Sequence, residues 1–159
     1  MSKLSNLRRV ATTVLVAVAI AGGAAAAVSG ADAAKARLNN MKALGASAKA
    51  LGDQLRSGSP DAAVVRAEAA KVNTAARAMS GWFPKGSGPE SGLKMRALPA
   101  IWTDAAGFTA AQTAFTAQAA RLNAAAQTGD MAVTGGELRS LFGACKGCHD
   151  KYRGPELPG

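Results

Sequence analysis

The chain has 159 residues, of which 48% are hydrophobic and 18% charged, and its formal net charge is +9. This length suits a single domain with enough apolar content for a core of its own. Lys and Arg residues are scattered and are not interleaved with aromatic residues, so the positive charge does not indicate nucleic-acid binding.

Residues 1–27 are typical of a secretory signal. They begin with Lys3, Arg8 and Arg9, continue as an uncharged, mostly apolar run over 10–20, and end in small residues over 21–27. The run is too short to span a membrane; the alternative is an anchor that is never cleaved. We expect a mature domain over residues 28–159 without a stable membrane anchor. Loss of the three basic residues, which no acidic residue accompanies, would lower the charge from +9 to +6.

The first two helices are predicted from apolar residues that recur every three or four positions. One helix is expected over about 31–57, ended by Ser57-Gly58, with the stripe Leu38, Met41, Gly45, Ala48, Leu51 or Gly52, and Leu55. The next is expected to start at Ser59 as N-cap and Pro60 as first helical residue. Its stripe is Val65, Ala69, Val72, Ala76 and Met79.

A glycine- and proline-rich connection over 81–92 contains Trp82 and Phe83, which predicts an ordered loop on the core. A third helix is expected from about 99 to 127, with Ile101, Trp102, Phe108, Ala111, Phe115, Ala119, Leu122 and Ala126 along one seam. A fourth is expected over about 134–153, with Leu138, Leu141, Phe142, Cys145, Cys148, His149 and Tyr152 on one stripe. Gly154-Pro155 stops it.

Four amphipathic helices with mostly short connections predict an all-α fold, an antiparallel up-down-up-down four-helix bundle. In that topology, large side chains from all four helices meet at one end of the molecule. They are Met41, Met79, Trp82, Phe83, Ile101, Trp102 and the Cys/His residues of the last helix. This is the end where a flat cofactor would fit between helices, although such residues can equally be ordinary core.

The last helix carries Cys145-Lys146-Gly147-Cys148-His149, the C-x-x-C-H pattern of covalent haem attachment. Two thiols three residues apart share one helix face, where they can form thioethers with two vinyl groups of a porphyrin. His149 then offers a ring nitrogen to the iron as proximal ligand. These are the only two cysteines and the only histidine in the chain. The pattern predicts one covalently bound haem c per chain.

Three other interpretations of the cysteine pair are weaker. A redox dithiol of the thioredoxin type occurs in a βαβ context, and no strand pattern is present. A zinc site would need a fourth ligand and usually a second Cys/His pair. A disulfide between Cys145 and Cys148 would close a very short loop and gain little stability.

With these motifs placed, the chain resembles the class II c-type cytochromes, the cytochrome c′ group and its low-spin relatives such as cytochrome c-556. The most specific match is residues 145–153, Cys-Lys-Gly-Cys-His-Asp-Lys-Tyr-Arg, on the last helix. Residues 82–88, residues 97–102 and the pattern Arg37-x-x-x-Met41-x-x-x-Gly45 also match. The resemblance implies a four-helix bundle, covalent haem and a bacterial periplasmic location.

The resemblance also implies roles for individual residues. Arg37, Trp102 and Arg153 are expected to bind the haem, with Arg37 near a propionate and Arg153 near the proximal face. The residue four positions after Arg37 would face the vacant side of the iron. In many cytochrome c′ sequences that residue is Leu, Phe or Tyr, which leaves the iron five-coordinate, but here it is Met41.

A methionine thioether is a haem ligand that raises the reduction potential. We therefore predict an electron-transfer cytochrome rather than an enzyme, with low-spin haem bound by His149 and Met41. The alternative is a five-coordinate cytochrome c′ that binds nitric oxide or carbon monoxide. The basic surface favours acidic redox partner proteins. Homodimers through the first two helices are common in the family, so a homodimer is left open.

Overall fold

The computed structural model describes residues 29–157. The predicted signal, residues 1–27, lies outside this range. Four long helices run α1 (Gly30–Arg56), α2 (Ala62–Ala78), α4 (Ala105–Thr128) and α5 (Met131–Tyr152). Three short ones, η1 (Met79–Trp82), η2 (Pro89–Ser91) and α3 (Ala100–Thr103), lie between α2 and α4. Residues 29–157 contain no strand, and the only pairing of that kind is an isolated bridge between Ala97 and Arg153.

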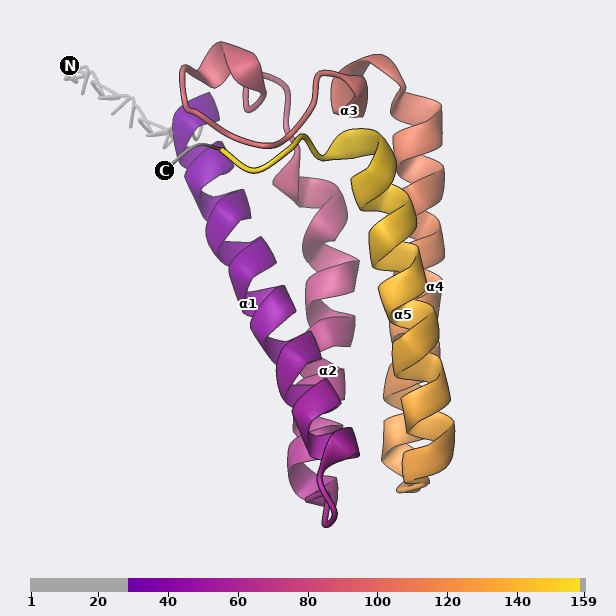
Figure 1. Cartoon of the computed structure of the whole chain (residues 1–159). Coiled ribbons are helices and arrows are strands. Elements are labelled where there is room, and N and C mark those ends of the chain that lie inside the picture. The colour runs from indigo at the N-terminus through magenta and orange to yellow at the C-terminus, as the bar shows by residue number, and fades with distance from the viewer. Residues whose placement is uncertain (1–28, 158–159) are drawn as a thin grey trace, which may run out of the picture.

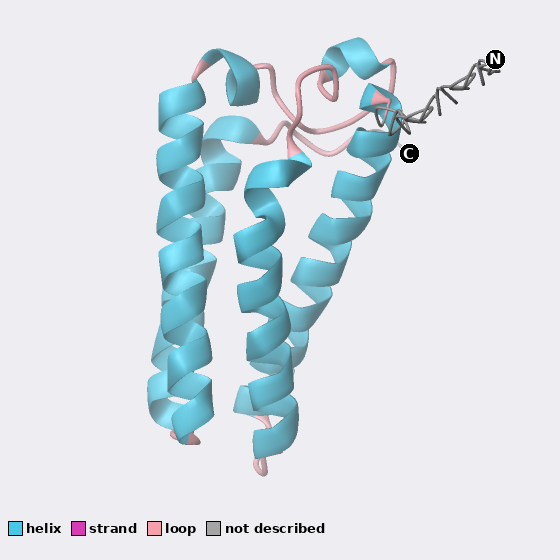
Figure 2. Ribbon diagram, turned by 180° about the vertical axis from the view of Figure 1, so that it is seen from behind, coloured by secondary structure: helices cyan, strands magenta, loops and turns pink. Residues whose placement is uncertain are grey.

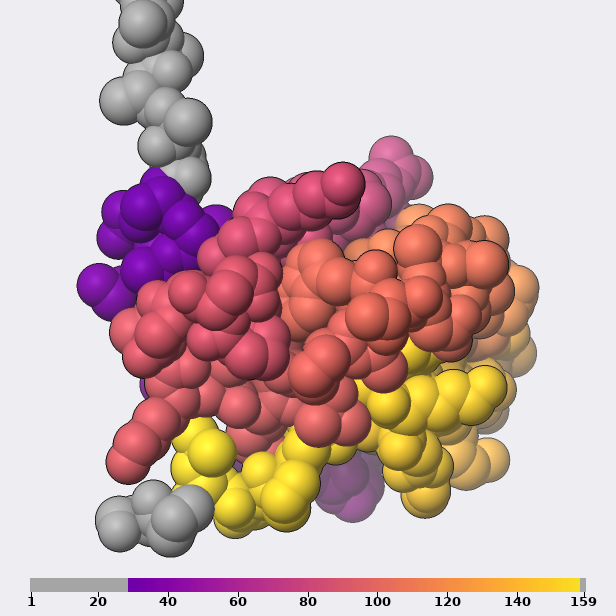
Figure 3. Space-filling model, turned by 90° about the horizontal axis from the view of Figure 1, so that it is seen from above, coloured from indigo at the N-terminus to yellow at the C-terminus, as the bar shows by residue number. Residues whose placement is uncertain are grey.

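The long helices alternate in direction, which confirms the predicted antiparallel bundle (Figure 1). α1 packs along α2, α2 along α4 and α4 along α5, whereas α1 and α5 contact each other over a much smaller part of their lengths. The start of α1, the end of α2, α3 and the end of α5 meet at one end, together with the long loop (Figure 2). Seen from above that end, the connection between α2 and α4 covers much of it, and the C-terminal segment lies along one side (Figure 3).

Two clusters of buried side chains form the core. The larger cluster runs between the helices and includes Leu51, Val65, Ala69, Val72, Ala76, Met79, Phe115, Ala119, Leu122, Ala126, Leu138 and Leu141. The smaller one, at the loop end, consists of Ile101, Phe108 and Tyr152. Phe83 packs against both clusters, so the long loop lies on the core as predicted.

Three helices begin directly after an aspartate that caps them, and their first residues differ from those predicted from the sequence. α2 begins after Asp61, whose Oδ1 accepts hydrogen bonds from the backbone N–H groups of Ala63 (2.7 Å) and Val64 (3.2 Å). The prediction of Ser59 as N-cap and Pro60 as first helical residue was therefore wrong. Asp130 caps α5 in the same way, so that α5 begins at Met131, three residues before the predicted start. The single helix expected over 99–127 is interrupted at Asp104, which caps α4. A carboxylate that accepts backbone N–H groups favours a new N-terminus over helix continuation.

Two residues predicted on core stripes lie on the surface. Leu38 on α1 is 55% exposed and Phe142 on α5 is 43% exposed. Each lies three residues before a half-buried residue on the same helix face, Met41 and Cys145 respectively. The apolar stripes of α1 and α5 therefore extend beyond the part of each face that the other helices cover.

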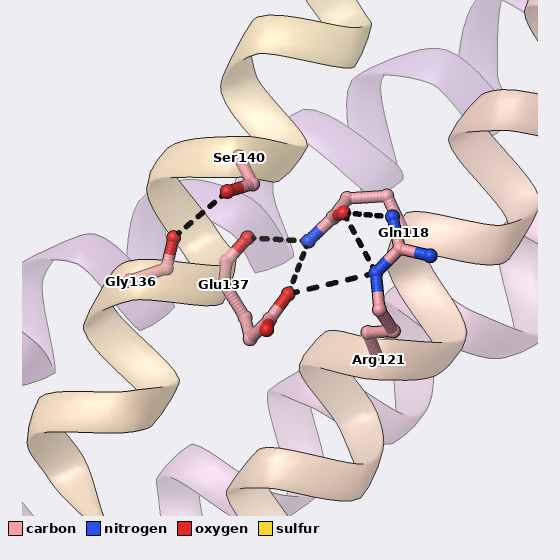
Figure 4. A network of polar contacts seen from close by, with 5 residues as sticks. All are labelled: Gln118, Arg121, Gly136, Glu137 and Ser140. Carbon is pink, nitrogen blue, oxygen red and sulfur yellow. Dashed lines mark hydrogen bonds and ion pairs between the residues drawn. The ribbon is translucent and has the colours of Figure 1, made fainter.

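A polar network joins α4 to α5 below the loop end (Figure 4). The buried side-chain amide of Gln118 donates to the backbone carbonyl of Glu137 (3.0 Å) and to its carboxylate (2.5 Å). Arg121 donates through Nε (3.1 Å) and Nη2 to the Gln118 carbonyl oxygen, and its Nε lies 3.8 Å from the Glu137 carboxylate. Because one partner is a backbone atom of α5, the network fixes the axial register of α5 against α4.

We expect Gln118→Ala to lower the free energy of unfolding of the haem-loaded protein by roughly 1–3 kcal/mol, because it removes a buried amide with several partners. The measurement is chemical or thermal denaturation followed by circular dichroism. Ser140→Ala is the matched control, since Ser140 is exposed and bonds only to a carbonyl one turn back on its own helix, and it should change stability by less than about 0.5 kcal/mol. Equal effects of the two substitutions would contradict the role of the network.

Candidate haem site

The two thiols lie near the end of α5 and point to the two core clusters. Cys145 is half-buried against the larger cluster, and Cys148 is half-buried against the smaller one. Both are free thiols. Burial, and then the nearby Cys148, raise the pKa of Cys145 to about 11, and burial raises the pKa of Cys148. Both sulfurs therefore stay protonated at neutral pH, which disfavours a reactive dithiol.

His149 follows Cys148 and lies at the surface of α5. Partial burial, and then the positive charges of Arg153 and Arg96, lower the pKa of His149. The neutral imidazole is thus the main form at neutral pH, and one of its ring nitrogens keeps the lone pair that a metal ligand needs. Arg96 was not singled out in the sequence. It is held in place by bonds from its Nε to the Gly154 carbonyl (2.9 Å) and from its Nη1 to the Glu156 carboxylate (3.1 Å).

Met41 lies on α1 and packs, half-buried, against the same cluster that Cys145 contacts. Gly45 follows one turn later, and nothing lies within 4 Å of where its Cβ would be. The thioether of α1 and the first thiol of α5 therefore both pack on the larger core cluster.

Arg37 is 6% exposed and is bound mainly by the long loop. Its Nη1 donates to the Trp82 carbonyl (3.1 Å) and the Ser87 hydroxyl (2.8 Å), and its Nη2 donates to the Ser87 carbonyl (2.7 Å) and the Met95 sulfur (3.2 Å). The guanidinium carbon also lies 5.0 Å from the centre of the Phe83 ring. Arg37 therefore joins α1 to the loop.

The charge of Arg37 is not neutralised by an ion pair within residues 29–157. Burial lowers its pKa, and the more distant negative charge of Glu90 partly offsets that effect. A buried cation without a contacting carboxylate is costly, so a negatively charged group would be favoured beside it.

Trp102 and Arg153 were also expected near the haem. The indole Nε1 of Trp102 donates to the carbonyls of Phe83 (3.2 Å) and Pro84 (3.3 Å), and its ring lies 5.7 Å from the Arg37 guanidinium carbon. Trp102 therefore belongs to the group of residues around Arg37. Arg153 is exposed, ends α5 and bridges to Ala97, and its charge acts on His149.

Sequence reasoning missed a second connection at this end. Asp104 accepts hydrogen bonds from the hydroxyl of Tyr152 (2.8 Å) and the backbone N–H of Gly107 (3.0 Å). These two bonds, led by that from Tyr152, lower the pKa of Asp104. Burial, and then the bond to Asp104, raise the pKa of Tyr152 to about 12. The signal in the sequence was an aspartate three residues before a glycine, a spacing that suits an N-cap.

The residues present fit a covalently bound haem. Two protonated thiols, a neutral imidazole and a thioether lie on the facing helices α5 and α1, beside the exposed apolar side chains of Leu38 and Phe142. Two surface grooves of about 530 Å³ each lie elsewhere, between α2 and α4 and between α1 and α2, and neither is lined by the cysteines. We therefore expect the haem on the sides of α5 and α1 that carry these residues. Arg37 is available to bind a carboxylate of the haem.

Comparison with known proteins found one matching family model and several relatives. The family model described as "Cytochrome C'" matches residues 32–153. A cytochrome c′ of Rubrivivax gelatinosus is 47% identical over 68 residues, which cover 43% of this chain and 53% of that protein. The match thus spans about half the length of that relative. A cytochrome c-556 of Agrobacterium tumefaciens is 31% identical over 125 residues, 74% of this chain and 91% of that protein.

Solved structures match over more of their length. The cytochrome c′ structure from Rubrivivax gelatinosus aligns with a TM-score of 0.73 and 33% identity, over 79% of this chain and 97% of that one. A ferrous variant of cytochrome c′ from Alcaligenes xylosoxidans with bound nitric oxide aligns with a TM-score of 0.72 and 27% identity, over 80% of this chain and 98% of that one.

We predict that Cys145 and Cys148 each form one thioether to the haem. Cys145→Ala should leave the haem held by one bond, and Cys145→Ala combined with Cys148→Ala should release it into acid acetone. The measurement is the haem left on the protein after extraction, with wild type as the fully retained reference. Full retention by the double variant would remove the basis of the assignment.

Proposed function

The chain belongs to the cytochrome c′ family, and we propose that it is a periplasmic electron-transfer protein whose low-spin haem is bound by His149 and Met41. Proteins of this family carry covalently bound haem c. The observation that supports Met41 most strongly is its position on α1, against the same cluster as Cys145 on α5. When bound, the haem supplies reversible one-electron chemistry at its iron.

His149 provides the ligand on the α5 side. Its lowered pKa keeps the imidazole unprotonated, so no proton has to be displaced before it binds iron at neutral pH. Arg153 and Arg96 add positive charge on this side. Nearby positive charge favours the reduced state of a metal centre, because reduction removes one unit of positive charge from it.

Met41 provides the ligand on the α1 side. A thioether is a neutral, polarisable donor, and Met/His ligation raises the potential of c-type haems. If His149 and Met41 both bind the iron, no coordination position would remain for a substrate. We therefore propose electron transfer without enzyme chemistry.

Arg37 is the residue proposed to bind a propionate. Its guanidinium is buried, is fixed by five polar or aromatic contacts from the loop, and has no carboxylate in an ion pair within the described residues. A propionate there would supply the missing negative charge, and Arg with a carboxylate makes a strong, charge-assisted hydrogen bond.

The partner is proposed to be an acidic protein that approaches the end of α5. Lys146 is paired with Asp150 (2.5 Å), while Lys151 and Arg153 are exposed and make no ion pair within residues 29–157. Export is supported by the signal-like sequence of residues 1–27. Within residues 29–157, no helix combines the length and the hydropathy that a membrane span needs.

A second function has specific support. Two relatives, 47% and 43% identical over about half of their length, are named cytochrome c′, and several of the similar structures hold nitric oxide. A gas-binding protein would need an open iron, with Met41 packed beside the haem but not bound to it. The two functions therefore differ in a single bond, between the Met41 sulfur and the iron.

Met41→Leu distinguishes the two functions. If Met41 is a ligand, wild type should be low-spin in both oxidation states and bind carbon monoxide slowly or not at all. The variant should become high-spin, lose potential and bind carbon monoxide readily, because leucine has no donor atom. The measurements are optical spectra with and without carbon monoxide and a redox titration.

Met79→Leu is the matched control, because Met79 is a methionine buried in the same cluster. It should leave the spectrum of the wild type unchanged. A wild type that is already high-spin, or a Met41→Leu spectrum identical to that of the parent, would instead support the gas-binding function.

A further inference from the structure

The last turn of α5 is joined to the first turn of α4 by one carboxylate. Asp104 ends the short helix α3 and caps α4, and its two oxygens have separate donors. Oδ1 accepts the backbone N–H of Gly107 at 3.0 Å, and Oδ2 accepts the hydroxyl of Tyr152 at 2.8 Å. The same side chain therefore starts one helix and binds the end of another.

Tyr152 is held at its ring, its hydroxyl and its backbone. It is 4% exposed, and its ring packs edge-on against Phe108 with centroids 5.0 Å apart and planes at 79°. Its carbonyl accepts the backbone N–H of Leu98 at 3.0 Å. A buried tyrosine hydroxyl needs a partner, and the Asp104 carboxylate is the partner that the structure provides.

Gly107 leaves the space in which this hydrogen bond forms. A Cβ at this position would lie 2.6 Å from the Tyr152 hydroxyl oxygen and closer still to the Asp104 carboxylate. By contrast, nothing lies within 4 Å of a Cβ added at Gly135 or Gly136 in α5. Position 107 therefore requires glycine, because a Cβ there would collide with the Asp104 carboxylate and the Tyr152 hydroxyl.

Tyr152 lies on the turn that carries the haem ligands. It follows Cys148 by four residues and His149 by three, so the three side chains project from adjacent positions of one helical turn. Cys148 packs on the same small cluster of Ile101, Phe108 and Tyr152. A rotation or shift of this turn would move the sulfur and the imidazole together.

We propose that Asp104 is a positioning residue for His149: its hydrogen bond to Tyr152 fixes the last turn of α5 and so sets the orientation of the imidazole toward the iron. This inference rests on the proposed role of His149 as a ligand. It is independent of Met41, because the bond acts on the α5 side of the haem in either of the two functions.

A merely structural role makes a different prediction. If the Asp104–Tyr152 bond only satisfies a buried hydroxyl, its loss lowers stability and leaves the haem iron unchanged. If it positions His149, its loss also changes the spectrum and potential of the iron, because both depend on the geometry of the proximal ligand.

The experiment compares haem-loaded wild type with Tyr152→Phe, Asp104→Asn and the double variant. Tyr152→Phe keeps the ring that packs on Phe108 and removes only the hydroxyl. Asp104→Asn keeps an oxygen that can cap α4 and places an amide group opposite the tyrosine. The measurements are the ferric electron paramagnetic resonance spectrum, the reduction potential and the melting temperature.

Asp130→Asn is the matched control. Asp130 caps the other end of α5 by accepting the backbone N–H groups of Ala132 and Val133. Like Asp104→Asn, this substitution changes a capping aspartate to asparagine, but Asp130 has no tyrosine partner among the described residues. The iron spectrum and the reduction potential should therefore remain as in wild type.

We expect Tyr152→Phe and Asp104→Asn to shift the iron spectrum and the potential in the same direction, by more than Asp130→Asn does. The double variant should shift them no further than the larger single change, because both substitutions remove the same hydrogen bond, from the Tyr152 hydroxyl to the Asp104 carboxylate. Lower melting temperatures with an unchanged spectrum and potential would overturn the proposal. If Asp104→Asn fails to fold, Tyr152→Phe alone decides, since it buries no new polar group. A failure of Met41 ligation would appear instead as a high-spin wild type, so the two proposals fail separately.

Discussion

The site depends on one constraint: α5 must pack firmly against α4 while it presents two thiols and an imidazole on adjacent faces. The side that contains Leu141 and Tyr152 is buried, and the Gln118 amide fixes its register through the Glu137 backbone. The side that contains Phe142 and His149 stays accessible. One helix can do both because its contact with α1 is small. The motif is therefore held by α4 and open toward the side on which the haem is proposed to lie.

The arginine side chains at the loop end of the bundle add positive charge around the proposed haem site. Three arginines carry this charge: Arg37 on α1, which is bound by the long loop, and Arg96 and Arg153, whose charges act on His149. Burial of Arg37 is offset by hydrogen bonds to carbonyl and hydroxyl oxygens but not by a contacting carboxylate. Such an arrangement favours an anionic group and a neutral imidazole. A haem would supply the anionic group through its propionates, and its iron would bind the imidazole. The same charges suit approach by an acidic partner.

The bundle and the haem motif were predictable because both are local in sequence. Three- and four-residue periodicity located four helices, and the C-x-x-C-H spacing needs one helical turn. The break at Asp104 was missed because the apolar seam continues through it, from Ile101 to Phe108. The network around Arg37 was missed because its partners lie 45 to 58 residues away. Periodicity cannot show such contacts, nor the surface exposure of Leu38 and Phe142, which depends on how closely α1 approaches α5.

The proposed bond between the Met41 sulfur and the iron distinguishes electron transfer from gas binding. The most direct measurement is the proton magnetic resonance spectrum of the ferrous, haem-loaded protein with isotopically labelled methionine methyl groups. Four methionines lie beyond residue 28, at positions 41, 79, 95 and 131. Ligation predicts a diamagnetic spectrum in which one methyl signal is strongly shifted upfield by the porphyrin ring current, and that signal is absent when Met41 is replaced. A paramagnetic ferrous spectrum, or an upfield methyl that persists after the replacement, would contradict the account.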